Sequence, residues 1–402
     1  MKQIRRQRIW GMLNILILFL SMMLHSQATA TRATDAIYLP FVATQPCAVE
    51  ADSGDAGLLS ASVESLPQPT LGIWIDAAEL AALPTAGPAW DYLKATADQP
   101  TAMPDLSDQD CDANVRVLAK ALVYARTGQV SYRAEVVDAL RIMTYYTTEA
   151  GGRTLALCRE LVAYVIAADL IDLGSADADL DTQFRIKLRA LLTKSLDGLT
   201  LQSTHEERPN NWGTHAGASR VAVALYLGDS AELERAATVF HGWLGNRAAY
   251  SGFSYGDLSW QADPANPVGV NPLGSMKDGH SIDGALPEEM RRGGAFQWPP
   301  APTGYPWEAL QGALVQAELL QRAGYPAWEW EDRALLRAVE FLYGIGWVPT
   351  GDDEWQVWLI NHAYGVDYAT DPIALPGKNM GWTSWTHSQD RPAASQTSRS
   401  NR

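Results

Sequence analysis

The sequence predicts an all-α fold in which helical hairpins follow one another along the chain. Apolar residues recur at helical spacing through most of residues 88–343, and short turns separate the repeats. Strand patterns do not alternate with these helices, which argues against a parallel sheet. Such hairpins curl into a toroid or extend as a solenoid. A tetratricopeptide-like segment at residues 119–139 does not recur in register, which disfavours the solenoid.

The same spacing places each element in chain order. We expect helices over residues 88–98, 113–126, 132–147, 155–173, 179–199, 211–227, 231–246, 307–323 and 328–343. The helix at 155–173 is apolar on more than one side, so we expect other helices around it. Residues 248–306 contain many Gly, Pro and aromatic residues without periodicity, which is typical of functional loops. Residues 347–387 are mixed.

The two ends of the chain differ from this helical part. Residues 1–30 combine a basic start, an apolar run at 12–24 and an Ala-Thr-Ala motif, which predicts a cleaved signal peptide. A retained anchor is the alternative. We expect a linker or N-terminal arm at residues 31–70, one folded domain at 71–388 and a disordered tail at 389–402. The protein is therefore expected to be secreted or periplasmic, without stable membrane association after signal cleavage.

Charge and cysteine content narrow the possible partners. Removal of the four cations of residues 1–30, which contain no acids, takes the formal net charge from -15 to -19. A chain this acidic is not expected to bind nucleic acid. The His and Cys spacings predict no metal site. One disulfide is possible in an oxidising compartment, and Cys111 with Cys158 is the pair we expect.

Two segments carry residues suited to chemistry on an acidic substrate. In the irregular region, Arg291 and Arg292 precede Tyr305, and an arginine fork neutralises carboxylates. Asn210 and Asn211 begin a predicted helix that also carries His215. Taken singly, each has a structural explanation: a surface ion pair with Glu288 and Glu289 for the arginines, and a helix cap for the asparagines.

Together these segments resemble a known family. The run Asp283-Gly284-x-Leu286-Pro287-x-Glu289-x-Arg291-Arg292-Gly293, followed by Tyr305 and the Asn210-Asn211 pair, is similar to the alginate lyase family of the chondroitin AC/alginate lyase superfamily. The similarity extends from about residue 71 to residue 387. It implies an incomplete α/α toroid that cleaves an acidic, uronic-acid-containing polysaccharide by β-elimination, without a metal or other cofactor.

The resemblance also implies roles for single residues. Asn211 donates to the substrate carboxylate, Arg292 supports the site electrostatically, and Tyr305 acts as the acid toward the departing oxygen. The family has a histidine where this chain has Trp212, and we expect His215, one helical turn later, to take its place. The gap between Arg292 and Tyr305 is longer than in the family and contains the proline-rich residues 297–302.

Further residues are candidates for substrate binding. Besides Asn210, Arg291 and Trp212, they are Trp260 and Trp298, whose indole rings can stack on sugars, and His280 in the irregular region. Two other classes remain open. A glycoside hydrolase would use two carboxylates chosen from Asp278, Asp283, Glu288 and Glu289. A non-catalytic helical module would bind a glycan or a protein.

Overall fold

The computed structural model describes residues 72–388, and it confirms the all-α class. The predicted signal peptide, the predicted linker and the predicted tail lie outside these residues. Within them, no helix combines the length and the apolar character needed to cross a membrane. Closure of the helices into a toroid remains a prediction.

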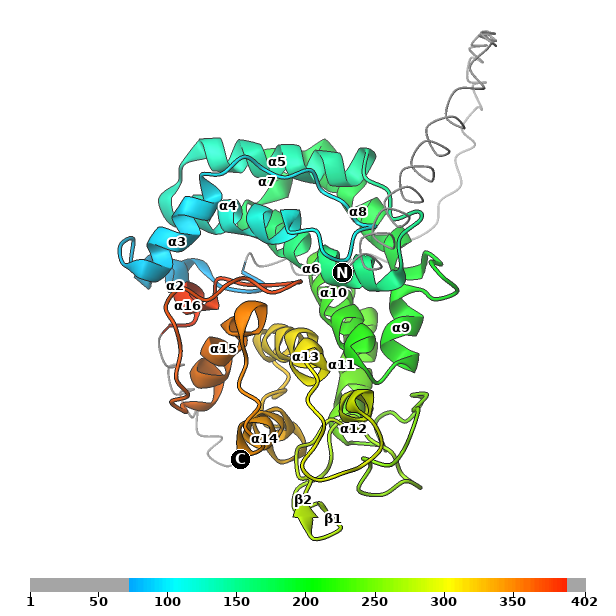
Figure 1. The fold of residues 1–402 in the computed structure, drawn as a ribbon. Coiled ribbons are helices and arrows are strands. Elements are labelled where there is room, and N and C mark those ends of the chain that lie inside the picture. The colour runs from blue at the N-terminus through cyan, green and yellow to red at the C-terminus, as the bar shows by residue number, and fades with distance from the viewer. Residues whose placement is uncertain (1–71, 389–402) are drawn as a thin grey trace, which may run out of the picture. The chain divides into compact units, whose positions relative to one another are not determined.

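The first helices form successive hairpins, as their spacing predicted. Helix α4 packs against α5 and α6, and α5 packs against α8 (Figure 1). The bounds are α2 (Ala77–Ala82), α3 (Pro88–Ala97), α4 (Ala113–Thr127), α5 (Val130–Tyr145), α6 (Thr154–Leu170), α7 (Leu173–Ala176) and α8 (Ala178–Thr193).

Three helices make up the centre of this helical part. Helix α10 (Asn211–Leu227) packs against both α6 and α13 (Tyr305–Arg322), and most of its residues are buried. Helix α6 is buried along nearly its whole length, as its apolar sequence predicted. Glycines permit very close packing here, because a Cβ at Gly312 would lie 2.3 Å from the carbonyl carbon of Thr214. The first turns of α10 and α13 are therefore held side by side.

The remaining elements surround this centre. Helices α9 (Leu201–Glu207) and α11 (Ser230–Leu244) pack on α10, and α14 (Trp330–Gly344) and α15 (Trp355–Tyr364) follow α13. Residues 245–304 are mostly irregular, as predicted. They include the short pair β1 (Met276–Lys277) and β2 (His280–Ser281), helix α12 (Pro287–Met290) and the 3-10 turn η1 (Arg291–Gly293). Helix α16 (Thr383–Thr386) ends the described part.

Two expectations need correction. Cys111 and Cys158 are both free, so the disulfide expected between them is absent. The helix expected over residues 179–199 ends at Thr193, because the chain turns there. A bridge between Leu196 and Leu199 closes that turn, and Asp197 in it has a positive φ. This turn also separates the short helix α9, which the periodicity did not predict.

Candidate functional site

The N-terminus of α10 positions the asparagine pair. The side chain of Asn210 caps the helix by accepting a hydrogen bond from the Trp212 N–H at 3.2 Å. The Asn211 N–H donates to the carboxyl group of Glu289. The side-chain amide of Asn211 makes no hydrogen bond to any described residue. The expected capping role therefore belongs to Asn210, while the amide of Asn211, a residue that is only 4% exposed, has no protein partner in this part of the chain.

Arg292 and Tyr305 lie against each other despite the proline-rich residues between them. The guanidinium carbon of Arg292 is 4.2 Å from the centre of the Tyr305 ring. Both side chains are accessible to solvent, and Tyr305 is 37% exposed. Tyr305 is the first residue of α13, so the start of this central helix fixes its backbone. A cation over an aromatic ring at an accessible surface is a pair that a substrate can reach.

His215 lies on α10 and has no exposed surface. Its Nε2 atom is 3.9 Å from the carboxylate of Glu308, and neither ring nitrogen has a hydrogen-bond partner among the described residues. Burial lowers the pKa of His215, which keeps the ring neutral. His215 is therefore a buried residue that supports the site, and it does not offer a surface to a substrate.

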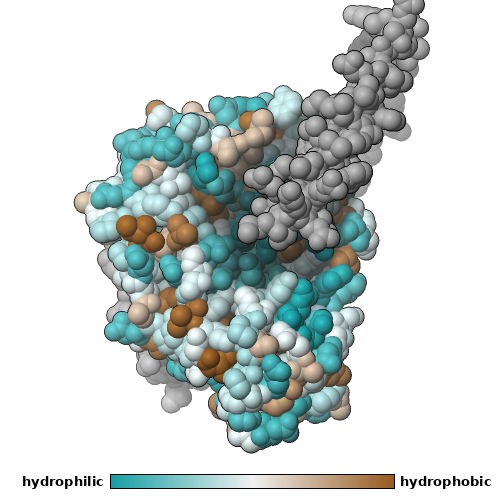
Figure 2. Space-filling model, viewed as in Figure 1, coloured by the Kyte–Doolittle hydropathy of each residue, from teal (hydrophilic) through white to brown (hydrophobic). Residues whose placement is uncertain are grey.

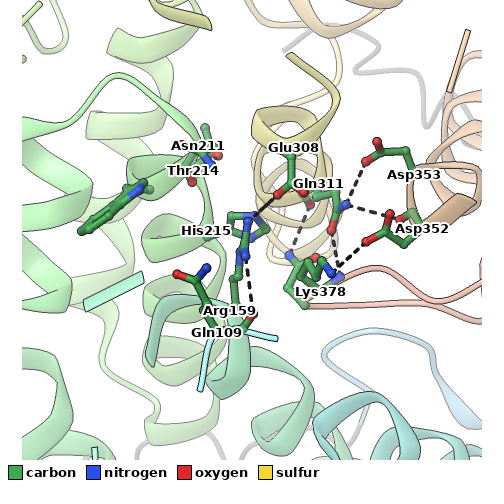
Figure 3. Close-up of polar contacts among 12 residues, drawn as sticks. Gln109, Arg159, Asn211, Thr214, His215, Glu308, Gln311, Asp352, Asp353 and Lys378 are labelled. Atoms are coloured by element: carbon green, nitrogen blue, oxygen red, sulfur yellow. Dashed lines mark hydrogen bonds and ion pairs between the residues drawn. The ribbon is translucent and has the colours of Figure 1, made fainter. Parts of the chain in front are cut away.

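Glu308 connects His215 to a group of charged residues. It forms an ion pair with Arg159 of α6, which is itself buried. Although burial alone would raise the pKa of Glu308, His215 and Arg159 lower it to about 2. Figure 3 shows Asn211, Thr214 and His215 on α10 facing Glu308 and Gln311 on α13. At this interface the carboxylate of Glu308 stays ionised. It lies one helical turn from Tyr305 on α13.

Lys378 extends the same group of charges toward α15. Its ammonium group is 3.3 Å from the carboxylate of Asp352 and 3.7 Å from that of Asp110 (Figure 3). Its backbone N–H donates to the side chain of Gln311 at 3.0 Å. Figure 2 shows that this face of the protein is hollowed near its centre and that hydrophilic residues surround the hollow.

Glu289 has the opposite electrostatic environment to Glu308. It is buried, and its second carboxyl oxygen has no hydrogen-bond partner among the described residues. Burial raises the pKa of Glu289 to about 8, although the Asn211 N–H and Arg292 favour the charged form. Glu289 is therefore largely protonated at neutral pH.

These two glutamates link the four predicted catalytic residues. Glu289 contacts the Asn211 backbone and lies in the segment that carries Arg292. Glu308 lies one turn from Tyr305 on α13 and faces His215, which is one turn from Asn211 on α10. The structure thus places all four predicted residues around the first turns of two adjacent helices.

A pocket lined by arginines opens beside this group. Its volume is about 330 Å³, and its lining includes three arginines and two glutamates, together with Asn210 and Tyr255: Arg208, Arg291, Arg292, Glu207 and Glu288. We call it the arginine pocket. Arg291 forms an ion pair with Glu288, whereas neither Arg208 nor Arg292 has a carboxylate partner among the described residues. In a chain of net charge -15, such a pocket is a local attraction for anions.

The predicted aromatic residues do not share one cleft. Trp212 is half-buried beside the cations of Arg153 and Arg208, at 4.6 and 5.0 Å from its ring. Trp260 is 1% exposed and donates to the Gly294 carbonyl, so it offers no open face to a sugar. Trp298 stacks on His280, and Trp298 lines a different pocket.

The carboxylates considered for a hydrolase are mostly held in local contacts. Asp283 forms an ion pair with Arg337, and Glu288 accepts from Arg291 and from the Gly256 N–H. Glu289 is buried against the start of α10. These contacts account for the positions of the three carboxyl groups without a role in hydrolysis.

Sequence reasoning missed Arg159, Glu308 and Lys378 as parts of the site. One signal was available for the first of them. Arg159 and Glu160 are neighbours in a largely apolar helix, and ionisable residues are seldom buried without a partner. Glu308 and Lys378 carry no comparable local signal, because their neighbours come from distant parts of the chain.

Comparison with known proteins identifies one family. Residues 82–253 match the family model described as alginate lyase. The matched region includes Asn210, Asn211 and His215, and it ends before Arg292 and Tyr305. No curated protein and no solved structure matches the chain.

Proposed function

We propose that this chain, which the match over residues 82–253 assigns to the alginate lyase family, cleaves a uronic-acid-containing polysaccharide by β-elimination. The family supports a polysaccharide lyase. The observation that carries the finer proposal is the contact between Arg292 and Tyr305 beside the arginine pocket. This contact joins a cation to a proton-carrying side chain at an accessible surface.

The reaction explains why these groups occur together. Removal of the proton on C5 of a uronate places negative charge on the adjacent carboxylate, and the bond from C4 to its oxygen then breaks. Fixed donors and cations aimed at that carboxylate stabilise the developing charge. In our proposal the Asn211 amide and Arg292 meet the carboxylate, and Tyr305 protonates the departing oxygen.

The buried residues have supporting roles in this proposal. Neutral His215 and ionised Glu308 fix the facing turns of α10 and α13, so that Asn211 and Tyr305 keep their separation. His215 has no exposed surface, so it does not serve here as the base that contacts the sugar. Tyr305 in its tyrosinate form, beside the cation of Arg292, would take the proton from C5 and then give the same proton to the departing O4 oxygen, so that one residue serves as both base and acid.

The proposal also includes export, which the predicted signal peptide supports. Export would bring the enzyme to a polymer outside the cell. Purified mature protein would therefore be the natural material for the assay.

The test is the appearance of the new double bond. Alginate, glucuronan and hyaluronan are mixed with the protein, and ultraviolet absorbance of the unsaturated product is followed. We expect at least one polymer to give a signal and Tyr305→Phe to reduce the rate about 100-fold or more. Tyr146→Phe, at an exposed position on the end of α5, is the matched control. If Tyr305→Phe and the wild type have equal rates, the assigned role of Tyr305 is wrong. If no polyuronate reacts, the lyase proposal fails.

A further inference from the structure

We propose that the pocket beside Trp298 is a second sugar-binding site, which takes an uncharged sugar ring. The pocket has a volume of about 360 Å³ and is lined by Ser281, Asp283, Trp298, Glu340, Phe341 and Gly344 among others. We call it the Trp298 pocket. It lies between the strand pair and the end of α14, and none of its lining residues lines the arginine pocket.

Trp298 provides the flat apolar surface that a sugar ring needs. It is 39% exposed, although the ring of His280 covers one of its faces at a centroid distance of 4.4 Å and an angle of 11°. The exposed area therefore belongs to the other face and the edges. Because the stacked histidine holds the indole, little conformational freedom is lost when a ligand stacks on it.

The polar groups of the pocket match hydroxyl groups. Glu340 is exposed and makes no hydrogen bond or ion pair with a described residue, so its carboxylate can accept from a ligand. Asp283 is held by Arg337 and by the Gly274 N–H, which fixes its position. Carboxylates next to an aromatic ring are suited to bind hydroxyl donors above an apolar ring face.

The charge of the pocket argues against a uronate. No Lys or Arg lines it among the described residues, and of its two carboxylates Asp283 is paired with Arg337 while Glu340 is not paired. A sugar that carries its own carboxylate would be repelled, whereas the arginine pocket attracts one. The two pockets therefore favour different sugars. This inference does not depend on the proposed lyase activity, because it concerns equilibrium binding at a separate place.

Gly344 offers a way to close the pocket without changing Trp298. A Cβ at this position would meet no atom within 4 Å, and the backbone of Gly344 does not have a positive φ. Gly344→Phe should therefore fold and place a ring in the pocket. Trp298→Ala removes the platform itself.

The experiment measures binding of neutral hexasaccharides by calorimetry, with cellohexaose and mannohexaose as probes. We expect one of them to bind the wild type and both variants to weaken its binding about tenfold or more. Tyr146→Ala, which removes an exposed aromatic ring elsewhere, should leave binding unchanged. Binding of a hexauronate should be the same in the wild type and both variants.

Three results would overturn the inference. The first is that neither neutral hexasaccharide binds. The second is that one binds but neither Trp298→Ala nor Gly344→Phe weakens it. The third is that the variants lose binding only of the hexauronate, which would assign a charged ligand to the pocket. If the protein showed no lyase activity, all of these binding measurements could still be made and would have the same meaning.

Discussion

Replacement of Glu289 by glutamine should make the protein more stable at alkaline pH. Burial raises the pKa of this carboxyl group from an ordinary value of 4.5 to about 8. Between these values the unfolded chain has released the proton and the folded protein retains it, so stability falls as pH rises. Each pH unit costs about 1.4 kcal/mol, which gives up to about 5 kcal/mol over the interval. Glutamine has nearly the same shape and cannot ionise.

The assay is urea denaturation of the wild type and Glu289→Gln at pH 5 and pH 8.5. We expect similar free energies of unfolding at pH 5 and a clear advantage for the variant at pH 8.5. Glu234→Gln on α11 is the matched control, because that side chain is exposed in the folded protein. If the difference between wild type and Glu289→Gln changes by less than about 1 kcal/mol between the two pH values, the carboxyl group is not buried as described.

Three further predictions test the supporting contacts. Arg159→Met should destabilise the protein by about 3 kcal/mol, because the Glu308 carboxylate loses its charged partner; a urea midpoint equal to that of the wild type would contradict this. Gly312→Ala should cost about 1–3 kcal/mol, since its Cβ would collide with the Thr214 backbone. An unchanged melting temperature would show that the two helices can separate at no cost. Arg208→Ala should raise KM for a polyuronate and leave kcat nearly unchanged. Initial rates measured across substrate concentrations give both constants, and a lower kcat with an unchanged KM would contradict this prediction.

The helices were largely predictable because local spacing determines them. Apolar residues at helical intervals located α4, and the actual helix Ala113–Thr127 differs from the expected 113–126 by one residue. Helix α9 was missed because it has only seven residues, too few for a periodic pattern to emerge. Its capping box at Thr200 and Ser203 was the available signal.

The sequence predicted which residues lie together at the site, but it did not predict how deeply each of them is buried. Helical spacing places His215 on the same face as Asn211, but spacing does not say how closely another helix covers that face. The approach of α13 at Gly312 buries His215, and this depends on packing between segments far apart in the chain. For the same reason, the sequence could not separate Trp298 from the arginine pocket.

The glycine contact between α10 and α13 also has a consequence for engineering. With the two backbones this close, Asn211 and Tyr305 are carried by one rigid unit, and the proline-rich residues 297–302 form a loop outside it. Changes in this loop would therefore leave the spacing of Asn211 and Tyr305 unaltered, whereas they could move Arg292, because Ala301 packs against the neighbouring Gly293. Libraries that aim at new polymer preferences can therefore vary the exposed positions of this loop and keep Trp298 and the Ala301 contact with Gly293.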